Sequence, residues 1–124
     1  GYPKYLSYFE QNFSSVDGFS VVSLMESYQM LAAKADAETA MSAMTKLKDI
    51  ATDMSQSLWR RFGATRAINT MASYYEEQAA AAEDEAKTQY AELVDQLDAM
   101  LDEIQEKETD SQLQSLYNQM IVKP

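Results

Sequence analysis

Apolar residues recur at helical spacing through two long stretches of the chain. In the first stretch the steps between them alternate between three and four residues, the heptad pattern of a packed helix seam. Its members are Met30, Ala33, Ala37, Ala40, Met44, Leu47, Ala51, Met54 and Leu58. In the second stretch the steps run three, four and four, an eleven-residue period that favours a nearly straight stripe. Its members are Ile68, Met71, Tyr75, Ala79, Ala82, Ala86, Tyr90, Leu93, Leu97, Leu101 and Ile104. Neither stretch contains Pro or Gly, so the pattern predicts two long helices.

Gly63 separates these stretches and has the sequence features of a helix end. Arg60 and Arg61 precede it, where the helix dipole favours cations, and glycine suits a left-handed position after a helix. Thr65 can cap the next helix. A short connection here predicts an antiparallel hairpin, with one helix over residues 20–62 and the other over residues 65–108. Large residues of one seam then face small residues of the other.

The predicted fold class is therefore all-α: a long, coiled-coil-like two-helix hairpin in a single domain of residues 1–124. An aromatic segment, residues 1–18, precedes the hairpin, and a short C-terminal helix over residues 111–122 follows it. We expect these segments to pack together at the open end of the hairpin, with Phe13 beside Leu113. The alternative is that each segment reaches a neighbouring subunit.

A two-helix rod of this kind leaves much of its apolar surface uncovered. Several apolar residues lie off the strict seams and widen the stripe: Met41, Ile50, Trp59, Val94 and Met100. A continuous apolar strip is unusual on a monomer. The pattern therefore predicts a protein partner, either another copy in a homo-oligomer or a helix of a different protein.

Composition excludes several kinds of chemistry. The 124 residues include no His and no Cys, which excludes disulfides, thiolate and imidazole chemistry, and most zinc, copper and haem sites. The net charge of -10 opposes binding to nucleic acid. No apolar run is long enough for a transmembrane segment. We predict no cofactor, and the general architecture favours a secreted or extracytoplasmic location over a cytosolic one.

Charge is unevenly distributed along the chain. Residues 76–110 carry thirteen acidic and two basic residues, whereas residues 46–75 carry five basic and two acidic residues. One interpretation is a head-to-tail contact between a basic hairpin tip, with Arg60, Arg61 and Arg66, and an acidic flank of another copy. The alternative is an ordinary solvated helix face. Three aspartates share one face of the second helix but lack the spacing of a calcium loop, so no metal site is predicted: Asp95, Asp98 and Asp102.

Catalytic patterns are missing from the sequence. It has no Gly-x-Ser-x-Gly or Ser-x-x-Lys motif and no Gly-rich phosphate loop, and a helical rod offers no cleft for paired carboxylates. We therefore predict that the protein is not an enzyme. Methionine and tyrosine are the candidates for partner binding instead. Met41 and Met100 lie off the seams, and Tyr74 points outward if Tyr75 points inward.

Trp59 and Gly63 lie near the predicted tip of an acidic helical hairpin. This arrangement resembles, in architecture, the small secreted WXG100 proteins of bacteria, which carry a Trp-x-Gly motif; here three residues separate Trp59 from Gly63. The resemblance covers the middle of the chain and implies a helical hairpin that works through contacts with other proteins.

Two functions follow from these features. The first is a non-enzymatic assembly module that associates with itself or with helical partners, such as a subunit of a secreted bacterial appendage or translocation apparatus. The second is an adaptor or chaperone whose Met- and Tyr-rich groove binds an amphipathic helix of a client.

Overall fold

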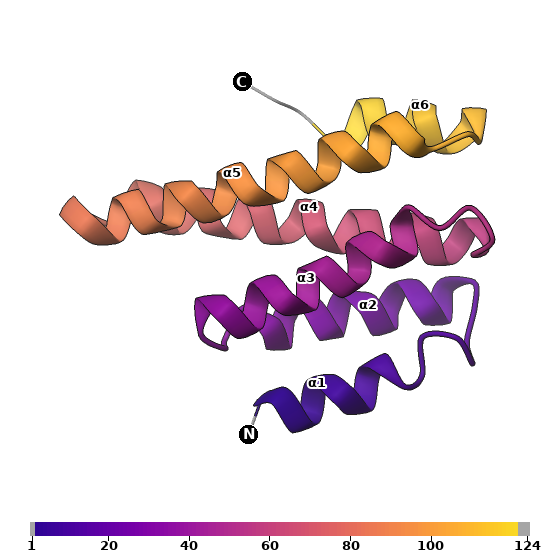
Figure 1. Ribbon diagram of the computed structural model, residues 1–124, viewed down its shortest axis with the longest axis horizontal. Coiled ribbons are helices and arrows are strands. Elements are labelled where there is room, and N and C mark those ends of the chain that lie inside the picture. The colour runs from indigo at the N-terminus through magenta and orange to yellow at the C-terminus, as the bar shows by residue number, and fades with distance from the viewer. Residues whose placement is uncertain (1, 122–124) are drawn as a thin grey trace.

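The computed structural model describes residues 2–121, and this part of the chain contains helices and no strands (Figure 1). Its six helices, in chain order, are α1 (Tyr2–Glu10), α2 (Phe19–Ala32), α3 (Ala37–Ala51), α4 (Leu58–Ala81), α5 (Asp84–Lys107) and α6 (Ser111–Met120). The predicted all-α class is confirmed. The C-terminal helix was predicted to end at residue 122, which lies outside the described residues.

The predicted turn at Gly63 is wrong, because α4 continues through this residue. Gly63 is buried where α4 packs against α2. A Cβ atom at this position would lie 3.0 Å from Met25 Sδ and 3.2 Å from Val22 Cα. Glycine is therefore needed here for the close approach of two helices, and not for a left-handed turn.

The predicted helix over residues 20–62 is divided into α2, α3 and the start of α4. Polar side chains end one helix and begin the next. Asp36 caps α3 by accepting a hydrogen bond from the Thr39 N–H (2.7 Å). In the next loop Asp53 accepts from both the N–H and the hydroxyl of Ser55, and Ser57 caps α4. These side chains satisfy backbone groups that a continuous helix would satisfy by itself.

The predicted helix over residues 65–108 is also divided, at Ala82 and Glu83. The chain reverses there, and α5 packs along α4 in the most extensive helix contact of the described chain. Asp84, the first residue of α5, has a positive φ of 57°. The reversal thus depends on a left-handed aspartate, a residue type that adopts this conformation more readily than most.

We expect Asp84→Val to lower the free energy of unfolding by about 1–2 kcal/mol relative to Asp84→Asn. Both substitutions remove the charge, but the β-branched valine strongly resists a positive φ. Urea denaturation of the two variants measures the difference. Equal stability would mean that the junction does not hold residue 84 in the left-handed conformation.

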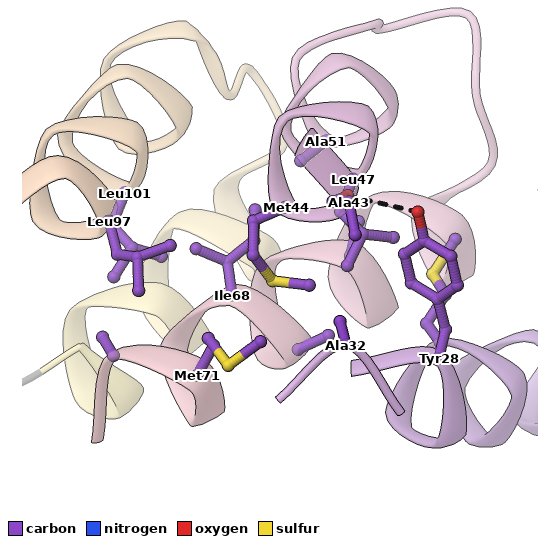
Figure 2. Close-up of a cluster of buried hydrophobic side chains, with 14 of the residues drawn as sticks. Tyr28, Ala32, Ala43, Met44, Leu47, Ala51, Ile68, Met71, Leu97 and Leu101 are labelled. Atoms are coloured by element: carbon purple, nitrogen blue, oxygen red, sulfur yellow. Dashed lines mark hydrogen bonds between the residues drawn. The ribbon is translucent and has the colours of Figure 1, made fainter. Parts of the chain in front are cut away.

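The core lies between α2, α3, α4 and α5 (Figure 2). Much of the predicted seam is inside it, including Met44 and Leu47 of α3, Ile68 and Met71 of α4, and Leu97 of α5. Four seam residues are exposed: Met30 (56%), Leu58 (43%), Ala37 and Ala86. The spacing predicted the inward faces of the helices well near the middle of the bundle and poorly at its ends.

The two ends of the chain pack on different helices. α1 packs against α2, and α6 packs against α4. Figure 1 shows α1 and α6 at opposite edges of the molecule, so the prediction that the two terminal segments pack together is wrong for these helices. The Phe13 ring meets Tyr28 edge-on instead, with 4.9 Å between ring centroids. The Tyr28 hydroxyl in turn donates to Glu10 (2.7 Å), which joins α1 to α2.

Candidate interaction surface

Large apolar side chains are exposed together where α4 begins and α6 lies beside it. Leu58 is 43% exposed, Trp59 42% and Leu116 46%. With Phe62 and Leu113 they line an open groove of about 360 Å³, with Gln112 and Asp110 also in its wall. We call this groove, with these seven lining residues, the Trp59 groove. Phe19, which is 77% exposed, extends the apolar surface because its ring packs on Trp59 with 4.9 Å between centroids.

Two capped helix starts position the groove. Ser57 accepts from the Arg60 N–H and begins α4 immediately before Leu58. Asp110 accepts from the Leu113 N–H and begins α6. Because each cap fixes the first turn of its helix, the walls of the groove come from ordered helical segments and not from loops.

A buried ion pair lies behind this end of the molecule. Arg61 is 6% exposed and Glu108 is 2% exposed. The guanidinium donates two hydrogen bonds to the Glu108 carboxylate, at 3.1 Å and 2.9 Å, and another to the Gln56 carbonyl. Glu108 Oε2 also accepts from the N–H groups of Thr109 and Asp110. The pair therefore joins the loop before α4 to the loop before α6, the two segments that precede the groove walls.

Arg60 joins the start of α4 to the segment between α1 and α2. Its guanidinium donates to the carbonyl oxygens of Phe13, Ser14 and Val16. Asp17 accepts from the Ser57 hydroxyl (2.7 Å), and this bond, more than the nearby Arg60 charge, lowers the pKa of the Asp17 carboxyl. Arg60 and Arg61, two of the three arginines of the predicted basic tip, thus make their contacts within the chain.

The other predicted interaction residues are distributed over the molecule. Arg66 is exposed and pairs with Glu26 at 3.1 Å. Tyr74 points outward and Tyr75 inward, as predicted. Met41 of α3 and Met100 of α5 are half-buried against the core, so they do not form an open methionine surface. The three aspartates lie along α5, with Asp95 and Asp102 exposed and Asp98 half-buried. Trp59 is therefore the only one of the predicted residues that lies in the apolar groove.

Sequence reasoning missed most of the residues around Trp59. Leu58 and Phe62 were assigned to the end of a helix, whereas they belong to the first turns of α4. Leu116 lies within the predicted C-terminal helix, but nothing in the sequence pattern indicated that its side chain is exposed. A signal was present in residues 52–57, which are polar except for Met54 and are typical of a loop that precedes a helix cap.

The described residues do not support a metal or membrane-spanning assignment. Within residues 2–121 no three Asp or Glu side chains form a group that could hold a metal ion. In the same part of the chain no helix is long and apolar enough to cross a membrane.

Comparison with known protein families, with curated proteins and with solved structures gives no match. The WXG100 resemblance also loses its basis in the fold, since Trp59 and Gly63 both lie inside α4 and not at a hairpin tip.

Proposed function

We propose that this chain is a non-enzymatic protein-interaction module that binds an amphipathic helix of a partner in the Trp59 groove. The observation that carries the proposal is the groove itself, because it gathers exposed leucine and aromatic side chains between two ordered helices. Apolar grooves between helices commonly bind the apolar face of a third helix. Tryptophan in such a position is a frequent binding anchor.

Charge favours a basic partner over a second copy. The chain has a net charge of -10, so two copies repel each other on average. The one charged residue in the groove wall is Asp110. The partner that fits is a helix with leucine or phenylalanine on one face and lysine or arginine beside it. Self-association is the competing function, and location in a secreted appendage or translocation apparatus stays a prediction from the sequence.

Trp59 allows a direct test, since it is the one tryptophan of the chain. The probe is a synthetic peptide with leucine at helical spacing and lysine beside the leucine face, and the control is a scrambled peptide of the same composition. We expect the periodic peptide to shift Trp59 fluorescence to shorter wavelength, because the indole leaves water. Equal effects of both peptides would contradict helix recognition.

Trp59→Ala should weaken binding of the labelled periodic peptide by roughly tenfold or more, measured by fluorescence anisotropy. The matched control is Tyr5→Ala, since Tyr5 is 60% exposed and lies on α1, away from the groove. Equal losses in the two variants would contradict the assignment of the site. Sedimentation equilibrium of the wild-type chain checks the competing function: a dimer that excludes the peptide and is abolished by Trp59→Ala would assign the groove to self-association.

A further inference from the structure

A second groove, unrelated to the proposed helix-binding site, lies near the other end of α4. Tyr74 lies fifteen positions after Trp59 on α4, which is roughly 22 Å along a helix. The groove lies between the α2–α3 turn and the helices α4 and α5, and encloses about 310 Å³. Figure 1 shows α4 and α5 projecting past α2 and α3 at this end of the molecule.

Three tyrosines dominate the chemistry of this groove. Tyr74, Tyr75 and Tyr90 all line it, together with Leu93, Gln89 and Asp36. We call this set of six residues the tyrosine groove. The ring of Tyr75 lies 5.5 Å from that of Tyr74 and 5.9 Å from that of Tyr90, measured between centroids. Tyr75 is buried, whereas Tyr74 and Tyr90 are partly exposed and accessible to a ligand.

Asp36 places a carboxylate in the wall of the same groove. Its side chain accepts the hydrogen bond of the Thr39 N–H, and this bond lowers the pKa of the carboxyl group. Asp36 is therefore ionised at neutral pH. Asp36 is also exposed, so its carboxylate borders the groove on the solvent side.

The surroundings add negative charge. Asp36 is the acidic residue of the groove wall, and residues 33–38, 73–78 and 85–93, which include and adjoin the lining residues, contain six acidic residues and two lysines in all. One of these lysines, Lys87, donates to the Ala79 carbonyl at 3.1 Å and is directed toward the α4–α5 junction. The groove thus combines electron-rich rings with an excess of carboxylates.

We propose that the tyrosine groove binds an organic cation, an alkylammonium or guanidinium group. Aromatic rings attract such cations through their quadrupole, and weakly hydrated cations gain most from this contact. A carboxylate beside the rings adds Coulomb attraction. The source of the group is either a small quaternary amine or the side chain of a basic residue in another protein.

The test is a titration followed by NMR chemical shifts of the backbone amides. The probes are choline, its neutral carbon isostere dimethylbutanol, and acetyl-arginine amide. We expect choline or acetyl-arginine amide to shift the amides of the residues that line the tyrosine groove, and dimethylbutanol to shift them much less. Tighter binding of choline would indicate a small quaternary amine, and tighter binding of acetyl-arginine amide would indicate a protein side chain. Equal shifts with dimethylbutanol, or shifts confined to other regions, would overturn the proposal.

Matched variants separate the contribution of the aromatic rings from that of the carboxylate. Tyr90→Phe keeps a ring and should bind the cation nearly as well as the wild type, whereas Tyr90→Leu should bind it roughly three- to tenfold more weakly. Asp36→Asn keeps a good helix cap and removes the charge, so it should also weaken binding. Asp49→Asn is its control, because Asp49 is an exposed carboxylate elsewhere on α3. If Tyr90→Leu and Asp36→Asn both bind as tightly as the controls, the site is not the tyrosine groove.

Discussion

Glu108→Gln should lower the free energy of unfolding by about 3–5 kcal/mol, because it leaves the Arg61 guanidinium buried without a countercharge. Both side chains are almost inaccessible to water, and the carboxylate accepts two bonds from Arg61 and two from backbone N–H groups. The amide of glutamine has nearly the same volume but presents donor hydrogens to this set of donors. A loss of this size is a large part of the stability of an ordinary small domain. Urea denaturation followed by far-UV circular dichroism measures it.

Glu106→Gln is the matched control, since Glu106 is an exposed glutamate two residues earlier, in the last turn of α5. We expect its effect to stay within about 0.5 kcal/mol. Arg61→Lys in the otherwise wild-type chain should also lower the free energy of unfolding, although it keeps the positive charge. An ammonium group cannot form the two parallel bonds that the guanidinium makes to Glu108. The double variant Arg61→Met, Glu108→Leu should lose less unfolding free energy than the sum of the losses of Arg61→Met and Glu108→Leu alone. The reason is that the double variant leaves no unpaired charge buried. Strict additivity would contradict a direct pair.

Gly63→Ala should lower the free energy of unfolding by about 1–3 kcal/mol, although alanine is the better helix former. The new methyl group would meet the backbone of Val22, which cannot move without shifting α2. Gly63→Val should lower the free energy of unfolding further, by about 3 kcal/mol or more, because the additional atoms of valine must fit into the same contact. Thermal and urea denaturation of both variants give the series.

Ser73→Ala and Ser73→Val are the controls for the two Gly63 variants. Ser73 is exposed on α4, so its substitution reports helix propensity without packing. We expect both to change stability by about 0.5 kcal/mol or less. If Gly63→Ala proved stabilising, as in an ordinary exposed helix, α2 and α4 would not pack as closely as the distances indicate.

Helical class and inward faces could be predicted from the sequence because both depend on local spacing. Met44, Leu47, Ile68 and Leu97 recur on one face of their helices, and burial follows directly from that pattern. The positions of the turns depend on other information. The apolar spacing continues through residues 52–57 and therefore predicted a continuous helix where the structure has a loop. Asp53, Ser55 and Ser57 in this segment are nevertheless typical of a turn followed by a helix cap.

Gly63 shows why the hairpin could not be placed correctly. A glycine near arginines fits the end of a helix, and it fits a close helix crossing equally well. Only the position of α2, which is distant in sequence, decides between the two. The real reversal follows Ala81 without a glycine or a side-chain cap, and its local signal is limited to the acidic residues Glu83, Asp84 and Glu85 at the start of α5. The Trp59 groove was missed for the same reason, since its walls come from separate parts of the chain.

We expect the Arg61–Glu108 pair to form late when the chain folds during its synthesis. Helices that follow each other in sequence pack together from α1 to α5, so each can find its neighbour soon after it leaves the ribosome. Arg61 is different, because its carboxylate lies 47 residues further along the chain. Until that segment emerges, the guanidinium must stay in water, and the loop before α4 has no fixed place. We therefore expect the Trp59 groove, which depends on this loop and on α6, to form late in folding.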